Sequence, residues 1–180
     1  MQKIHQLSLE YGFSIIEDAS HAIGGFYQNQ PIGNCKFSDI CIFSFHPVKI
    51  ITTAEGGVAT TNNSALAETM CLLRSHGITR DPRLMSEPTH GDWYYQQIEL
   101  GYNYRMNEMQ AALGISQLKK IDFFVKRRRE IVEIYNRELR DINYIITPPE
   151  DENVNSNFHI YVIQVLENKF FDRYDLYNHL

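Results

Sequence analysis

A lysine between two apolar segments places the tightest constraint on how this chain can fold. Ile40–Phe43 is typical of a buried strand, and Gly57–Thr61 is typical of a second. Pro47 ends the first strand because it has no backbone N–H to donate, and Gly56 allows a tight turn before the second. Lys49 is therefore expected in a short, partly desolvated loop, where desolvation favours the neutral, nucleophilic amine. A surface charge is the competing interpretation.

A carboxylate follows another predicted strand upstream. Ser14–Glu17 is apolar enough for a strand, and Asp18 stands at its carboxyl end. In α/β sheets this is the edge at which ligands bind. Pyridoxal phosphate needs such a carboxylate beside its ring nitrogen, because the protonated ring is the better electron sink. Asp18 as a helix N-cap is the alternative, but Asp18 and Lys49 on neighbouring strand ends together favour a cofactor site.

Three ordered motifs identify a family. Glu17–Ala22 reads EDASHA, Ser44–Lys49 reads SFHPVK and is followed by Glu55–Gly57, and Gly101–Met106 reads GYNYRM. Together they resemble the nucleotide-sugar aminotransferases of the DegT/DnrJ/EryC1/StrS family, over nearly the whole chain and more weakly after about Leu139. The resemblance implies an α/β chain of the aspartate aminotransferase fold, which is fold type I of the pyridoxal-phosphate (PLP)-dependent transferases.

The resemblance also assigns a cofactor site. It implies that Lys49 is the catalytic residue and carries pyridoxal 5'-phosphate covalently, that Asp18 pairs with the ring nitrogen, and that His21 lies by the phenolic oxygen. Ser44 stands five positions before Lys49, the family's spacing for a serine that donates to the cofactor phosphate. A packed turn histidine is the alternative for His21, and a serine that satisfies its own backbone is the alternative for Ser44.

A second subunit is implied by the same resemblance. In relatives the segment equivalent to Gly101–Met106 crosses a homodimer and places an amide or a basic side chain at the partner's cofactor phosphate. Asn103 and Arg105 are both candidates for this contact, and the sequence does not choose between them.

Aromatic residues in a long aperiodic segment are candidates for substrate contact. Ser75–Leu100 lacks periodicity, and loops of such length in compact domains are usually functional. Trp93 and Tyr94 in this segment are suited to stacking on a uracil ring or a sugar face, with half-buried packing as the alternative. His46 is a further candidate for substrate contact.

The substrate expectation rests on three stretches, His46–Glu55, Arg74–Pro82 and Trp93–Leu100. They resemble the branch of the family that acts in pseudaminic acid biosynthesis. This implies transamination at C4 of a UDP-4-keto-6-deoxy-N-acetylhexosamine with L-glutamate as amino donor. A transaminase for another nucleotide-4-ketosugar is the main alternative, and a silent chain that only contacts other subunits is another. A dehydratase of the same fold would carry histidine at the Lys49 position.

Helical patterns fill much of the remaining chain. Helices are predicted over Ser64–Arg74, Glu108–Leu118 and Ile121–Leu139 from their apolar spacing. Asn63 and Asn107 are the expected N-caps of the first two, since an Asn side chain accepts a hydrogen bond from an unpaired N–H of the first turn.

Two domains are expected. Residues 1–142 correspond to part of the large PLP-binding domain, and residues 143–180 correspond to the beginning of a small C-terminal α+β domain. His159–Val165 is predicted to be a strand that opens this second domain. Helical patterns that run to both ends of the chain favour an internal portion of a longer enzyme.

Charge and cysteine usage exclude several partner classes. A formal net charge of −5 argues against nucleic acid or an anionic membrane as a partner, and the basic run Lys126–Arg129 is interpreted as the solvated face of a helix. There is no apolar run of about 18 residues to span a membrane. Three cysteines without paired or metal-ligand spacing favour reduced thiols in a cytoplasmic protein without a metal site.

Overall fold

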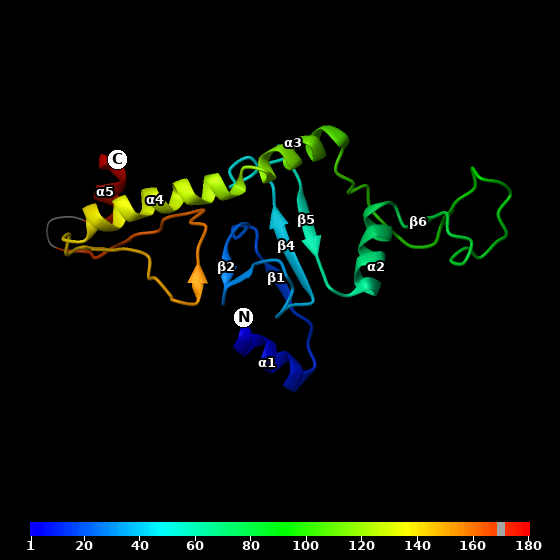
Figure 1. Ribbon diagram of the computed structural model, residues 1–180, viewed down its shortest axis with the longest axis horizontal. Helices are drawn as coiled ribbons and strands as arrows, with labels where there is room; N and C mark the ends of the chain where they lie inside the picture. The colour runs from blue at the N-terminus through cyan, green and yellow to red at the C-terminus, as the bar shows by residue number, and fades with distance from the viewer. Residues whose placement is uncertain (169–171) are drawn as a thin grey trace.

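A three-stranded sheet forms the centre of the molecule. The computed structural model of the chain describes residues 1–168 and 172–180. The sheet has the order β1-β4-β5 and consists of β1 (Ile16–Asp18), β4 (Ile40–Ser44) and β5 (Gly57–Thr60). β1 pairs in parallel with β4, with Asp18 opposite Ile42, whereas β5 is antiparallel to β4, with Ser44 opposite Gly57. β1 and β4 therefore end at the same edge of the sheet (Figure 1).

Short strands form further pairs outside the central sheet. They are β2 (Phe26–Tyr27), β3 (Gln30–Pro31), β6 (Ile78–Thr79), β7 (Gln96–Gln97), β8 (Ile145–Ile146), β9 (Val154–Asn155) and β10 (Gln164–Val165). β6 pairs with β7, β8 pairs with β10, and a further sheet has the order β3-β2-β9. The antiparallel pairing of β2 with β9 returns the C-terminal part of the chain to the turn that follows β1.

Helices account for most of the remaining regular structure. They are α1 (Gln2–Tyr11), α2 (Ser64–Arg74), α3 (Glu108–Leu118), α4 (Ile121–Leu139) and α5 (Arg173–His179). Figure 1 shows α3 across the sheet edge at which β4 ends, and α4 continues from there toward the C-terminus. The loop between β6 and β7 extends to the opposite end of the molecule. Among the described residues, no helix is both long and apolar enough to cross a membrane.

The core consists of two buried clusters, one of which includes residues of the loop that carries Lys49. One buried cluster comprises Ala19, Cys35, Cys41 and Phe43, and the other comprises Ile50, Ile51 and Val125. Burial is the main reason why the pKa of the Cys41 thiol is raised to about 12. This thiol is therefore protonated and acts as a small apolar side chain.

The sequence predicted the helices better than the C-terminal strands. The bounds predicted for α2, α3 and α4 are those of the structure. Asn63 accepts from the N–H groups of Ala65 and Leu66, and Asn107 forms a reciprocal capping box with Gln110. These two N-caps are confirmed.

Two predictions in the C-terminal half were wrong. The strand predicted over His159–Val165 contains only β10, at its end, and the backbone of His159 bonds to the side chains of Arg128 and Asn157 instead of a sheet. The basic run on α4 is not simply solvated. Arg128 Nη1 donates to the carbonyl of His159 at 3.3 Å, and Arg129 Nε donates to the carbonyl of Ser156 at 2.9 Å.

Candidate active site

The carboxylate of Asp18 stands at the carboxyl end of β1, as the sequence predicted. It is exposed, and its Oδ1 accepts the N–H of Ser20 at 3.0 Å. Hydrogen bonds from Ser20 hold the pKa of Asp18 below its usual value, with smaller contributions from the charges of His21 and Lys49. Asp18 thus closes a local turn and also lies within electrostatic range of the lysine loop.

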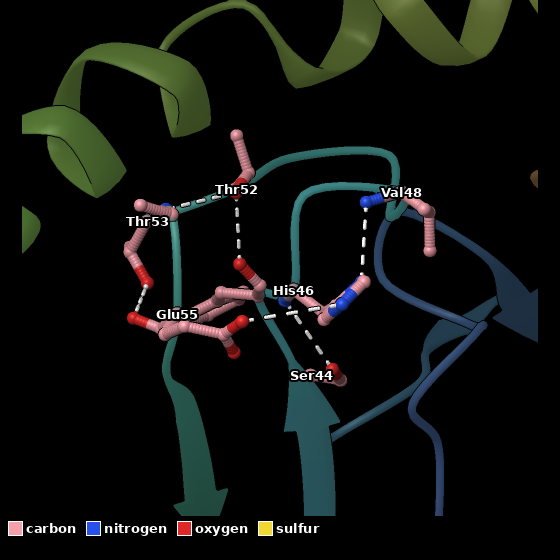
Figure 2. A network of polar contacts seen from close by, with 8 residues as sticks. Ser44, His46, Val48, Thr52, Thr53 and Glu55 are labelled. Carbon is pink, nitrogen blue, oxygen red and sulfur yellow. Dashed lines mark hydrogen bonds and ion pairs between the residues drawn. The ribbon is translucent and has the colours of Figure 1, made fainter.

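The loop between β4 and β5 is closed by its own polar groups (Figure 2). On its outgoing side, the Ser44 hydroxyl oxygen accepts the N–H of His46 at 3.4 Å, and His46 Nδ1 accepts the N–H of Val48 at 3.3 Å. The backbone N–H of Lys49 then donates to the carbonyl of His46 at 2.9 Å, which completes a tight turn. His46 Nε2 lies 4.0 Å from Glu55 Oε1, across the loop. His46 therefore helps to shape the loop, and this role is separate from its predicted contact with the substrate.

Two threonines close the returning side of the loop. The Thr52 hydroxyl donates to the carbonyl of Phe45 at 2.9 Å and accepts the N–H of Ala54 at 2.9 Å. The Thr53 hydroxyl donates to the carbonyl of Glu55 at 2.7 Å (Figure 2), and Thr53 is only 1% exposed. These bonds satisfy polar groups on the returning side of the loop from within.

Apolar anchors hold Lys49 in place. Ile50 and Ile51, which follow it directly, are 7% and 2% exposed and cluster with Val125 of α4. Lys49 itself is half-buried. The expectation of a partly desolvated lysine in a loop between two strands is thus met by its placement.

Gly56 brings the segment before α3 against this loop. Its φ of +146° favours glycine, and a Cβ there would lie 2.6 Å from Thr53 Oγ1 and 2.8 Å from Met106 Cε. In α3, a Cβ on Gly114 would lie 2.8 Å from Thr53 Cγ2. These close approaches pack α3 and the residues before it onto the Lys49 loop.

His21 lies in the turn after Asp18 and contacts a residue that sequence reasoning did not single out. Its ring centroid is 4.5 Å from that of His159, with the two rings tilted by 58°. Asn157, which is 4% exposed, donates from Nδ2 to the carbonyls of His21 and Ile23, both at 2.8 Å. Asn157 and His159 were missed because they lie 134 or more positions from this turn and carry no motif of their own.

The other predicted site residues lie on the segment between β6 and α3. Asn103 forms an isolated bridge with Ser75 beside the end of α2, and Arg105 is exposed. Trp93 is 75% exposed and Tyr94 is half-buried against His90, both in the loop that extends beyond α2 (Figure 1). The structure therefore brings together Asp18, His21, Ser44 and Lys49, whereas Asn103 pairs beside α2 and Trp93 and Tyr94 lie in the extended loop.

The fold and the arrangement of this edge define the class of protein. Helices accompany a mixed sheet whose edge carries a carboxylate, a hydroxyl and a lysine loop. This arrangement agrees with part of the expected fold type I transferase. The sequence profile of the DegT/DnrJ/EryC1/StrS aminotransferase family matches residues 1–180. The chain belongs to this family.

Curated relatives and solved structures agree with this membership. The UDP-4-amino-4,6-dideoxy-N-acetyl-beta-L-altrosamine transaminase of Campylobacter jejuni is 39% identical over 180 residues, which cover 100% of this chain and 45% of that protein. Helicobacter pylori PseC, an aminotransferase involved in the biosynthesis of pseudoaminic acid, superposes with a TM-score of 0.84 and 36% identity, over 97% of this chain and 44% of that one. Spr1654 from Streptococcus pneumoniae in its PLP-form has a TM-score of 0.74 and 28% identity, over 91% and 42%. The chain thus spans less than half the length of these proteins.

The buried hydroxyl of Thr53 generates a prediction about the Lys49 loop. Thr53→Val keeps the shape of the side chain but leaves the Glu55 carbonyl without its donor, so the free energy of unfolding should fall by about 1–3 kcal/mol. Urea denaturation measures this change. Thr69→Val on exposed α2 is the matched control and should stay within about 0.5 kcal/mol of the wild type. Equal effects of the two substitutions would contradict a structural role for Thr53.

Proposed function

We propose that this chain forms the cofactor-binding part of a PLP-dependent nucleotide-sugar aminotransferase. The enzyme aminates C4 of a UDP-4-keto-6-deoxy-N-acetylhexosamine with L-glutamate as donor, in pseudaminic acid biosynthesis. The observation that carries the proposal is the parallel pairing of β1 with β4, which puts Asp18 and the Ser44–Lys49 loop at one edge. The names of the Campylobacter and Helicobacter relatives support the substrate class.

The residues at this edge fit pyridoxal phosphate. The Asp18 carboxylate is exposed and ionised, since hydrogen bonds from Ser20 lower its pKa, so it is suited to hold a pyridinium proton. The Ser44 hydroxyl lies at the end of β4, five positions before a half-buried lysine. In addition, Nδ1 of His159 is buried and has no hydrogen-bond partner in the part of the chain that the structure describes, so the site can still take up a polar ligand. Spr1654 in its PLP-form supports the choice of cofactor.

Each residue has a defined task in this proposal. When bound, pyridoxal phosphate supplies an electron sink. Lys49 would hold the cofactor covalently, and its amine would take the proton from Cα of glutamate and deliver a proton to C4 of the sugar. The Asp18 carboxylate would keep the ring nitrogen protonated, His21 would face the phenolic oxygen, and the Ser44 hydroxyl would donate to the phosphate.

A homodimer completes the site in this proposal. Asn103 pairs with Ser75 beside α2 and Arg105 is exposed, so both are available to a partner's cofactor phosphate. Trp93 and Tyr94, on the extended loop, would then contact the nucleotide sugar together with His46. A transaminase for a different nucleotide-4-ketosugar is the alternative, because the residues at the sheet edge do not distinguish one sugar from another.

The first test concerns the covalent link. Sodium borohydride makes the bond between pyridoxal and its lysine permanent, so peptide mass mapping of the reduced holoenzyme should find the pyridoxyl group on Lys49. Lys49→Arg keeps the charge but cannot form the link, and it should remain unlabelled. A pyridoxyl group on Lys36 or on another lysine would refute the assignment.

The role of Asp18 predicts a loss of turnover without a matching loss of sugar binding. Asp18→Asn removes the charge that keeps the ring nitrogen protonated, so kcat should fall about 100-fold or more while KM for the UDP-sugar changes little. Steady-state kinetics of the holoenzyme separate the two constants. Asp141→Asn, at an exposed position after α4, is the matched control and should leave both constants unchanged. An Asp18→Asn variant with the wild-type kcat would remove Asp18 from the site.

The substrate class predicts a preference among ketosugars. The protein should aminate a UDP-4-keto-6-deoxy-N-acetylhexosamine with a kcat/KM at least about tenfold above that for dTDP-4-ketosugars, because specificity is a difference in transition-state binding. Product formation with L-glutamate, followed by mass spectrometry, measures this ratio. A preference for a dTDP-sugar would overturn the pseudaminate assignment and leave the transaminase class intact.

A further inference from the structure

We propose that His159 is a positioning residue for the Lys49 site, with its ring holding the ring of His21 in place beside the cofactor. This inference rests on the proposed function, in which His21 faces pyridoxal phosphate. It assigns a function to the segment 156–159, which follows β9 and belongs to the part of the chain expected to open the second domain.

The contact between the two histidines is the first support. Their ring centroids are 4.5 Å apart, close enough for direct packing, and His21 is otherwise exposed. An exposed imidazole in a turn can adopt several rotamers, whereas an imidazole packed against a half-buried ring has few. His159 therefore restricts the orientation of His21.

Asn157 fixes the backbone beneath the same ring. Its amide bridges the carbonyls of His21 and Ile23, and its Oδ1 accepts the N–H of His159 at 3.1 Å. One buried side chain thus connects both histidines. A buried amide with three hydrogen bonds holds the turn after Asp18 and the segment 156–159 in a fixed relation.

Helix α4 holds this segment from the other side. Arg129 donates to the carbonyl of Ser156, and Arg128 donates to the carbonyls of Phe158 and His159 at 3.2 and 3.3 Å. The same helix contributes Val125 to the cluster that buries the residues after Lys49. His159 is therefore placed by the element that also places the lysine loop.

The surroundings of His159 keep its imidazole neutral. Burial is the main cause of its lowered pKa, and the cationic groups that act on it, from His21, Lys49 and Arg128, lower it further. A neutral ring packs against His21 without repelling the Lys49 amine. No hydrogen bond joins the two imidazoles within the described part of the chain, so the packing of their rings makes the contact.

The test compares His159→Ala with His159→Phe, which keeps an aromatic ring. In the cofactor-free protein with ¹³C-labelled histidine, NMR should show cross-relaxation between the two wild-type imidazoles. The His21 signal should shift and broaden in His159→Ala and return toward the wild type in His159→Phe. His5→Ala, which removes a distant edge contact with Phe37, is the control and should leave the His21 signal unchanged. An unchanged His21 signal in His159→Ala would overturn the proposal.

The holoenzyme provides the second readout. His159→Ala should lower kcat about tenfold with KM for the UDP-sugar within about twofold, since a misplaced group beside the reacting centre costs turnover. His159→Phe should recover most of the kcat. If His159→Phe were as impaired as His159→Ala, a nitrogen of His159 would be acting on the ligand, and a purely positioning role would be wrong.

A second variant distinguishes loss of the histidine contact from simple unfolding. Different outcomes would overturn the proposed function and the contact between the histidines. Asn157→Asp keeps the shape of the side chain but loses the Nδ2 donors, and it should shift the His21 signal in the same direction as His159→Ala. Absence of pyridoxal on Lys49 in the wild type would overturn the proposed function and the cofactor part of this inference. The NMR comparison involves no cofactor and therefore tests the contact between the histidines by itself.

Discussion

The packing of Ile50 and Ile51 against Val125 of α4 is the interaction on which the candidate site depends. These isoleucines directly follow Lys49, so their burial fixes where the lysine leaves the backbone. Val125 also contacts the turn after β1, because a Cβ on Gly24, whose φ is +78°, would lie 2.9 Å from Val125 Cγ2. One apolar side chain thus sets the distance between the two loops that carry the polar groups. Loss of such a buried side chain costs about 0.5–5 kcal/mol, depending on how many carbons are removed.

Parallel pairing of β1 with β4 provides the second constraint. Asp18 and Ser44 reach the same edge because both strands run in the same direction. Along β4 the side chains alternate, so Cys41 and Phe43 are buried on one face while Ile42 is 39% exposed on the other. A register shift by one residue would exchange these faces. The register that buries the core is therefore also the register that brings the carboxylate beside the lysine loop.

Local features of this chain could be predicted from the sequence, and remote ones could not. Asn63 and Asn107 cap helices through bonds to residues two or three positions away, so their effect is visible in a short window. The bonds of Asn157 to the turn after Asp18 span 134 and 136 positions, and a preference for strand in the neighbouring apolar residues concealed them. Arg128 and Arg129 were misjudged for the same reason, because a basic run looks alike whether it faces water or backbone carbonyls.

The two halves of the site are thus stabilised in different ways. The Lys49 loop is closed by hydrogen bonds among residues 44–56, all between positions close in sequence. The His21 turn depends on a segment far along the chain, so it reaches its final shape only when that segment has docked on α4. A lysine that is proposed to hold a cofactor needs a fixed position before any ligand arrives, and local bonds provide it. The His21 ring is held by a segment far along the chain, so the geometry of this half of the site depends on long-range contacts.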